Sequence, residues 1–173
     1  MIECDPGFFC ENGIAKECSP GTVATDPGLT ECGECPIGAN CIDPANPYQC
    51  ADGTHPDETK TICKLCSVGY FCKNGLSETC PPGTSATDPG LDECLQCPNG
   101  MNCADPMRPE YCPAGQYPND SQTSCLDCQP GNYCVYEVFL CQVGRNCSQY
   151  GLASVSLCIT LISLKNDLSG KRL

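Results

Sequence analysis

The chain has 173 residues, of which 21 are cysteine and none is tryptophan, and it carries a formal net charge of −12. So much cysteine in a short chain is typical of a disulfide scaffold, and because disulfides persist in oxidising compartments we expect an extracellular or cell-surface protein. The acidic charge argues against nucleic acid or an anionic membrane as a partner, since both require a basic face.

The N-terminal residues do not look like an export signal. Residues 1–4 contain no basic segment followed by an apolar stretch, which a signal peptide requires. We therefore expect the chain to be a fragment of a longer secreted protein whose signal peptide lies upstream.

The cysteines repeat with a fixed spacing. Four CxxC pairs begin at Cys32, Cys63, Cys94 and Cys125, at equal intervals. Successive units alternate between two sequence types, odd and even, so the sequence of segment 10–32 recurs two units later in segment 72–94. Such self-similarity predicts a tandem array. The predicted units are a partial first repeat at 1–31, full repeats at 32–62, 63–93 and 94–124, the start of a fifth repeat at 125–134, and a divergent tail at 135–173.

Turns dominate the residues between the cysteines. Asp26-Pro27-Gly28 places proline second and glycine third, as a type II turn requires, and predicts a hairpin-like reversal; Asp88-Pro89-Gly90 repeats it. Short extended pieces such as 22–25 are the strand candidates, and no window before residue 135 has helical periodicity.

Apolar residues are too few for a conventional core. Residues 1–134 contain only 16 Leu, Ile, Val and Phe in total, which cannot offset a chain entropy of roughly 1 to 2 kcal/mol per residue. The predicted fold is therefore small and disulfide-rich: an elongated tandem array of modules of about 31 residues, with short β-hairpins and turns, little helix and no large hydrophobic core.

Two local disulfide schemes suit a unit with four cysteines. The preferred scheme joins the ends of each long loop and pairs all 18 regular cysteines, whereas an interleaved scheme (Cys32 with Cys41, Cys35 with Cys50) leaves Cys10 unpaired and stays open. The preferred pairs are Cys4 with Cys10, Cys18 with Cys32, Cys35 with Cys41, Cys50 with Cys63, Cys66 with Cys72, Cys80 with Cys94, Cys97 with Cys103, Cys112 with Cys125, and Cys128 with Cys134.

The tail at 135–173 loses the spacing, contains no proline and changes charge sign. It has three interpretations: a non-native read-through, a terminal cap of the array, or a membrane segment. For the last, the stretch from Gly151 to Leu164 is shorter than the roughly 20 residues that a spanning helix needs. Cys141, Cys147 and Cys158 are left over and are candidates for intermolecular bonds.

The residues offer little for catalysis or metal binding. The single histidine, His55, lies in a predicted surface turn without a companion nucleophile, so we expect no catalytic residue and no enzyme. The CxxC pairs recur among turns and not at a helix start, which argues against a redox centre. Two CxxC pairs could bind zinc, but the intervening cysteines favour disulfides, so no metal or cofactor site is expected.

Two N-glycosylation sequons fit an exported chain. Asn119-Asp120-Ser121 lies in a predicted turn, and Asn146-Cys147-Ser148 lies in the divergent tail.

The motifs carry a family likeness over residues 4–134. CPxGxxC at 35–41 and 97–103, with CPPGT at 80–84, resembles the ephrin-receptor-like cysteine-rich repeats of large surface proteins. The long loop closed by a cysteine and followed by CxxC is also similar to the first half of a tumour-necrosis-factor-receptor module. Both resemblances imply an extended extracellular region with little regular secondary structure, and neither specifies a role.

These observations favour a non-catalytic extracellular scaffold or stalk for adhesion or protein binding. The alternative is a self-assembling filament or matrix subunit that binds neighbouring copies of itself, and a zinc protein is less favoured. The expected partners are proteins and an N-linked glycan, with neither nucleic acid nor a small-molecule substrate.

Overall fold

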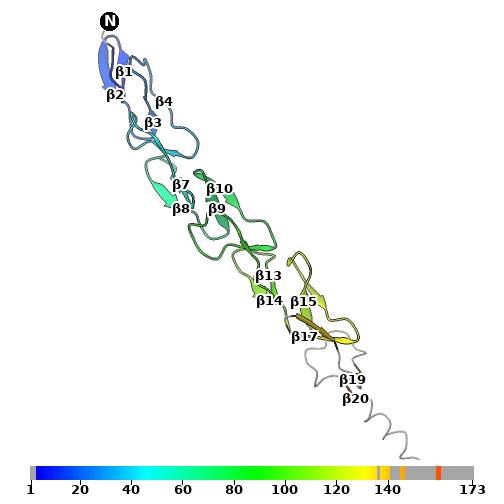
Figure 1. Cartoon of the computed structure of the whole chain (residues 1–173). Helices are drawn as coiled ribbons and strands as arrows, with labels where there is room; N and C mark the ends of the chain where they lie inside the picture. The colour runs from blue at the N-terminus through cyan, green and yellow to red at the C-terminus, as the bar shows by residue number, and fades with distance from the viewer. Residues whose placement is uncertain (1–2, 136, 141–144, 147–158, 161–173) are drawn as a thin grey trace, which may run out of the picture. The chain divides into compact units, whose positions relative to one another are not determined.

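The chain folds as two compact units of short hairpins. The structure is a computed structural model that describes residues 3–135, 137–140, 145–146 and 159–160. Unit 1 comprises residues 3–80 and 86–94, and unit 2 comprises residues 81–85 and the described residues from 95 onward. The described residues contain strands and turns but no helix (Figure 1). The predicted small disulfide-rich fold is thereby confirmed.

Unit 1 contains five two-stranded antiparallel sheets, each formed by consecutive strands. They are β1 (Phe8–Glu11) with β2 (Ile14–Glu17), β3 (Thr22–Val23) with β4 (Gly33–Glu34), β5 (Ala39–Asn40) with β6 (Tyr48–Gln49), β7 (Thr54–Pro56) with β8 (Cys63–Leu65), and β9 (Tyr70–Lys73) with β10 (Leu76–Thr79).

The described part of unit 2 repeats this arrangement. Its pairs are β11 (Thr84–Ser85) with β12 (Leu95–Gln96), β13 (Met101–Asn102) with β14 (Glu110–Tyr111), β15 (Gln116–Pro118) with β16 (Cys125–Asp127), β17 (Asn132–Val135) with β18 (Glu137–Leu140), and β19 (Arg145–Asn146) with β20 (Ile159–Thr160).

The longest strands of unit 1 flank Asn-Gly pairs. In the β1–β2 hairpin Glu11 lies opposite Ile14, so Asn12-Gly13 forms a two-residue loop with φ values of 52° and 79°. Positive φ at both positions defines a type I′ turn, whose twist matches that of the two strands. The predicted short β-hairpins are confirmed here, although the sequence analysis did not use the Asn-Gly signal that locates this one.

The predicted Asp-Pro-Gly turns are present, and each reverses the chain within a longer loop. Gly28 has φ 74° and Gly90 has φ 81°, as the third position of a type II turn requires. In unit 1 the turn lies inside the loop that joins β3 to β4. The candidate strand at 22–25 is shortened to Thr22–Val23.

Cysteine sulfurs form the interior. The buried apolar side chains are cysteines together with Ala24, Ala39 and Ala86. Nine disulfides connect the described cysteines, and they are the nine bonds of the long-loop scheme: five close six-residue separations and four close separations of 13 or 14 residues. By the chain-entropy argument each longer bond contributes on the order of 3 kcal/mol, which replaces the missing core.

Glycine N–H groups connect each loop to the next one along the chain. In unit 1 Gly21 N–H donates to the Cys41 carbonyl at 2.8 Å, and Gly53 N–H donates to the Cys72 carbonyl at 2.8 Å. In unit 2 Gly83 N–H donates to the Cys103 carbonyl at 2.8 Å. The same backbone hydrogen bond therefore recurs at equivalent positions of the sequence repeat.

The hairpin pattern runs past residue 134. β17 and β18 pair as far as Leu140, where the sequence predicted a divergent tail from residue 135. Cys141, Cys147 and Cys158 and nearly all of the segment 151–164 lie outside the described residues. In the part of the chain that is described, no helix is long and apolar enough to cross a membrane.

Candidate binding loops

Two loops in equivalent positions are the best candidates for a binding site. Loop 1 (residues 40–48) runs from β5 to β6 in unit 1, and loop 2 (residues 102–110) runs from β13 to β14 in unit 2. They occupy the same place in two successive copies of the sequence repeat, so each serves as a control for the other.

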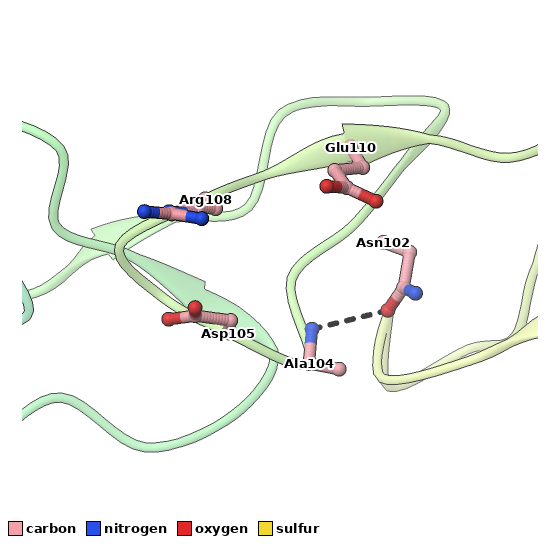
Figure 2. Close-up of a pocket in the computed structure, with 5 residues that line it drawn as sticks. All are labelled: Asn102, Ala104, Asp105, Arg108 and Glu110. Atoms are coloured by element: carbon pink, nitrogen blue, oxygen red, sulfur yellow. Dashed lines mark hydrogen bonds between the residues drawn. The ribbon is translucent and has the colours of Figure 1, made fainter.

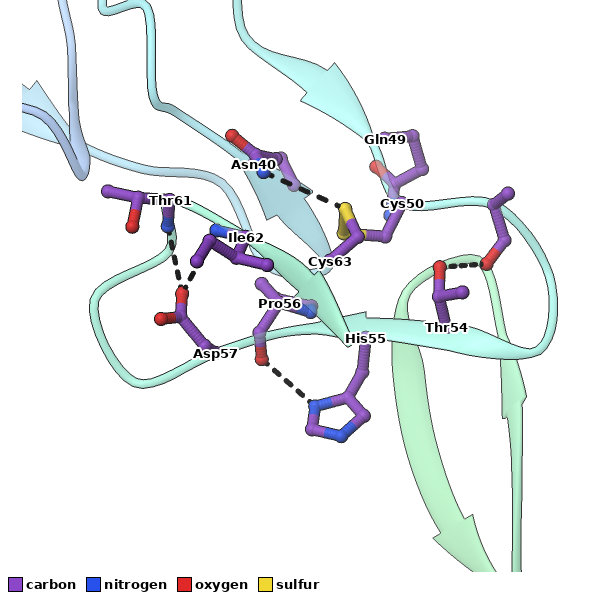
Figure 3. Close-up of a disulfide and its surroundings, with 12 residues drawn as sticks. Asn40, Gln49, Cys50, Thr54, His55, Pro56, Asp57, Thr61, Ile62 and Cys63 are labelled. Atoms are coloured by element: carbon purple, nitrogen blue, oxygen red, sulfur yellow. Dashed lines mark hydrogen bonds between the residues drawn. A yellow bond between two sulfur atoms is a disulfide. The ribbon is translucent and has the colours of Figure 1, made fainter. Parts of the chain in front are cut away.

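Loop 1 is held by its own polar groups. Asn40 is 1% exposed, and its Oδ1 accepts the Ile42 N–H at 2.9 Å while its Nδ2 donates to Cys63 Sγ at 3.8 Å (Figure 3). Asp43 Oδ1 accepts the Ala45 N–H at 3.0 Å, and the Asp43 carbonyl accepts the Asn46 N–H at 3.1 Å. These local bonds, together with the Ala24 N–H that donates to the Pro44 carbonyl at 2.7 Å, hold the loop.

Loop 2 repeats these backbone bonds. Asn102 Oδ1 accepts the Ala104 N–H at 3.0 Å, Asp105 Oδ1 accepts the Met107 N–H at 2.9 Å, and the Asp105 carbonyl accepts the Arg108 N–H at 3.0 Å. The Asn40 and Asn102 side chains therefore both bond to turn backbone. The side chains at the other loop positions are therefore free to differ.

Two of the exposed side chains of loop 1 are large and apolar. Ile42 is 51% exposed and Tyr48 is 53% exposed, whereas the equivalent residues of loop 2 are Ala104 and Glu110. Because loop 2 makes the same backbone bonds with small or charged residues there, the fold does not require Ile42 or Tyr48. Exposed apolar side chains without a structural role indicate a contact surface.

The same contrast continues beside loop 1. Ile37 is 79% exposed and Ile62 is 57% exposed, and the second copy has Asn99 and Ser124 at the equivalent positions. At these four positions the first even repeat carries exposed apolar side chains, whereas the second even repeat exposes Met107 and Tyr111 at other positions.

Loop 2 forms a charged hollow. A depression of about 270 Å³ is lined by Asn102, Ala104, Asp105, Arg108 and Glu110 (Figure 2). No ion pair within 4.0 Å connects Arg108 to a carboxylate in the described part of the chain. Its guanidinium can therefore bind a carboxylate of a partner.

Hydrogen bonds stabilise the ionised form of two carboxylates in the first even repeat. The Asn46 side chain and the Ala45 N–H lower the pKa of Asp43 below its ordinary value. The Thr59 hydroxyl, followed by the N–H groups of Thr61 and Ile62, lowers the pKa of Asp57. Figure 3 shows the bonds from the Thr61 and Ile62 N–H groups to the Asp57 carboxylate. Both carboxylates are therefore charged at neutral pH and shape the loops.

The predicted glycosylation residue Asn119 occupies the position equivalent to Asp57. It is half-buried, its Oδ1 accepts the N–H of Thr123 at 2.8 Å and of Ser124 at 3.2 Å, and its Nδ2 donates to Thr123 Oγ1 at 3.3 Å. Glycosylation there stays a prediction, as it does for Asn146, whose backbone lies in β19.

His55 lies in β7 and not in a loop, and its Nδ1 is 2.9 Å from the Pro56 carbonyl oxygen (Figure 3). Within the described residues no group of three or more His, Cys, Asp or Glu side chains could hold a metal ion.

Neither binding loop was predicted from the sequence. Loop 1 contains two prolines and an aspartate, so its two exposed apolar residues looked like ordinary loop composition. The available signal was the difference between the two copies: at equivalent loop positions, isoleucine and tyrosine in one copy are replaced by alanine and glutamate in the other.

The fold and these loops define a class, an extracellular cysteine-rich binding module, and comparison with known proteins supports that class. No family model matches the chain. It is 32% identical over 98 residues to a Caenorhabditis elegans protein described as containing a chitin-binding domain, covering 49% of this chain and 6% of that protein. It is 27% identical over 111 residues to mouse tumour necrosis factor receptor superfamily member 9, covering 49% of this chain and 43% of the receptor.

The chain thus spans less than half the length of either relative. The second likeness supports the resemblance to tumour-necrosis-factor-receptor modules, while the ephrin-receptor-like resemblance stays a prediction. Neither relative is described as an enzyme, and both fit an extracellular or cell-surface location.

Proposed function

We propose that this protein is a non-catalytic extracellular module that binds a protein ligand through loop 1 and its apolar surroundings. The observation that carries the proposal is the exposure of Ile42 and Tyr48 on a loop whose backbone bonds are reproduced without them in loop 2. Aromatic and aliphatic anchors of this kind dominate the energetics of protein interfaces. The disulfides hold the loop in place before binding, which lowers the entropic cost of association.

Receptor-like binding is one form of this function that the comparisons support. The matched mouse protein is a receptor by name, and the repeat with its long cysteine-closed loop is similar to modules of that kind. In our proposal the remaining repeats act as a scaffold or stalk of an exported protein.

The test is a binding screen of the oxidised, secreted chain against extracellular and cell-surface proteins displayed singly on cells. Replacing Ile42 by alanine and Tyr48 by glutamate should weaken binding of a genuine ligand at least tenfold, while a Leu126→Ala variant, which removes an apolar side chain 43% exposed in unit 2, should bind normally. A ligand that binds all three proteins equally would contradict the assignment to loop 1.

Carbohydrate binding is a second candidate. Tyr48 is an exposed aromatic ring that could stack on a sugar, and one relative is described as containing a chitin-binding domain. Retention on chitin beads that is lost on Tyr48→Ala would favour this candidate over a protein ligand.

Self-assembly is the other alternative. Cys141, Cys147 and Cys158, which lie outside the described residues, would supply intermolecular bonds. Sedimentation under oxidising conditions separates the alternatives, because a filament subunit grows with concentration and a binding module stays monomeric. Zinc binding requires thiolates, and the nine disulfides use 18 of the cysteines.

A further inference from the structure

The two Asn-Gly hairpin tips of unit 1 have different surroundings, and the tip of the β9–β10 hairpin is docked onto the even repeat that precedes it. Asn74 N–H donates to Asp52 Oδ1 at 2.9 Å, and the Asn74 carbonyl accepts a hydrogen bond from the Gln49 side chain. Lys73 Nζ lies 3.9 Å from Asp52 Oδ2. The docked tip thus makes three polar contacts with two side chains of that repeat.

The docked tip is also closely packed. A Cβ added to Gly75 would overlap the Gly38 carbonyl oxygen, and a Cβ added to Gly38 would overlap the Asn74 carbonyl oxygen. Both glycines are buried. The backbone at Asn74 and Gly75 therefore has little room to change its conformation.

The tip of the β1–β2 hairpin has the same conformation without these contacts. Asn12-Gly13 has φ values of 52° and 79°, against 50° and 70° for Asn74-Gly75. Asn12 and Gly13 are both exposed, and no described atom beyond the two neighbouring residues lies within 4 Å of the position that a Gly13 Cβ would occupy. Among the described residues, this tip is held only by its own hairpin.

Asparagine followed by glycine undergoes deamidation without an enzyme. The glycine backbone nitrogen attacks Cγ of the asparagine side chain, and the amide nitrogen leaves as ammonia after it takes up a proton. The glycine nitrogen loses its own proton, and the product is a five-membered succinimide ring. Water then opens the ring at either carbonyl, which leaves aspartate or isoaspartate. Glycine favours the attack because it has no Cβ to obstruct it.

We propose that Asn12 is a deamidation site of the folded protein, and that Asn74 is protected by its contacts with the preceding repeat. The succinimide ring holds the asparagine ψ angle far from its value in a type I′ turn, so the turn must open before the attack. At Asn12 this opening disturbs only the exposed end of the β1–β2 hairpin. At Asn74 it also breaks the contacts to Asp52 and Gln49, which makes the open state rarer. Asn12 lies outside loop 1, so this modification is independent of ligand binding there.

The modification changes the first hairpin in two ways. Isoaspartate adds one methylene carbon to the main chain, so the two-residue loop between Glu11 and Ile14 loses the length and twist of a type I′ turn. Either product also adds a carboxylate next to Glu11, which is paired with Lys16. We expect the β1–β2 pairing to weaken as the protein ages, while the β9–β10 pairing stays unchanged.

The test is a time course of the oxidised, secreted chain at neutral pH and body temperature. Digestion at mildly acidic pH, which suppresses further deamidation, is followed by mass spectrometry that separates asparagine, aspartate and isoaspartate peptides. The reduced chain in urea is the reference, because Ile14 and Leu76 follow the two Asn-Gly pairs and the intrinsic rates should be similar. In the folded chain we expect Asn12 to deamidate at least about tenfold faster than Asn74, since three polar contacts oppose opening at Asn74.

A double variant, Gln49→Ala with Asp52→Ala, removes the contacts to the docked tip without changing either Asn-Gly pair. It should raise the Asn74 rate several-fold and leave the Asn12 rate unchanged, with its disulfides verified by mapping. Equal rates at Asn12 and Asn74 in the folded original chain would overturn the proposal, and so would an Asn12 that stays intact while the unfolded chain deamidates. An Asn74 rate that does not rise in the double variant would contradict protection by the preceding repeat.

Discussion

Gly13 and Gly75 occupy the same position of two type I′ turns, yet their surroundings differ completely. Gly75 is buried against the backbone of Gly38, and Gly13 is exposed with no described atom within 4 Å of its Cβ position. A pair of identical substitutions can therefore separate the strain of a left-handed backbone from the steric cost of a close contact.

We expect Gly13→Ala to lower the free energy of unfolding by about 1 to 2 kcal/mol, because a Cβ in the left-handed region costs that much. Gly75→Ala should cost about 2 kcal/mol more, since its Cβ also overlaps the Gly38 carbonyl oxygen. Denaturant unfolding of the two oxidised variants measures both values. Equal losses would show that the docked tip in unit 1 contributes nothing to stability.

Asp57 and Asn119 perform the same task with different chemistry. Asp57 Oδ1 accepts the N–H of Thr61 at 2.9 Å and of Ile62 at 3.2 Å, as Asn119 Oδ1 does for the equivalent N–H groups in unit 2. A neutral amide oxygen is therefore sufficient for this loop.

The lowered pKa of Asp57 predicts an acid-dependent loss of stability in its loop. Because the folded pKa lies below the ordinary value of 3.8, the carboxylate stabilises the fold above that pH, and this contribution disappears as pH falls through the folded pKa. Asp57→Asn should flatten the pH dependence below pH 4 while keeping the fold at pH 7, and Asp57→Ala should destabilise at pH 7. The measurement is hydrogen exchange of the Thr61 and Ile62 N–H groups at several pH values.

At the scale of elements, the two binding loops share the same backbone hydrogen bonds but present different side chains to solvent. In each loop the asparagine side chain and the following aspartate side chain accept backbone N–H groups, while Ile42 and Tyr48 of loop 1 are replaced by Ala104 and Glu110 in loop 2. Changing Ile42 to alanine and Tyr48 to glutamate should therefore alter the free energy of unfolding by no more than about 0.5 kcal/mol. Thermal unfolding of the oxidised variant checks this, and a loss above about 2 kcal/mol would give these side chains a structural role.

The elements were only partly predictable from sequence. The turn residues predicted reversals at Gly28 and Gly90 correctly, because φ is positive there. The four-residue strands beside Asn12-Gly13 and Asn74-Gly75 were missed, since their side chains are mostly exposed and show no apolar alternation. The contact between Gly38 and Gly75 could not be predicted, because the two glycines lie far apart in the sequence and carry no distinguishing side chain.

At the scale of the whole molecule, disulfides substitute for a hydrophobic core. The sequence predicted this from its composition, because the small number of large apolar residues left no other source of stability. The described structure agrees: its interior is cysteine and alanine, while large apolar residues such as Ile14 and Leu65 are exposed. Binding surfaces were less predictable, because exposed apolar residues are common in a fold without a large core. Only comparison with the second copy of the repeat shows that the fold does not require a given exposed apolar residue.

Reduction should unfold both units. Four bonds that close separations of 13 or 14 residues contribute on the order of 3 kcal/mol each, comparable in sum to the stability of an ordinary domain. Excess dithiothreitol should collapse the dispersion of the amide NMR spectrum at neutral pH and room temperature. A dispersed spectrum of the fully reduced chain would mean that other interactions hold the fold.

The most direct test of the central claim, that these cysteines form the structural interior of an extracellular module, is disulfide mapping of the secreted protein by non-reducing mass spectrometry with free-thiol labelling. We predict nine bonds within the region 4–134, with Cys50 joined to Cys63 and Cys112 joined to Cys125 among them. Widespread free thiols, or cross-linked peptides that join Cys35 to Cys50, would contradict the account.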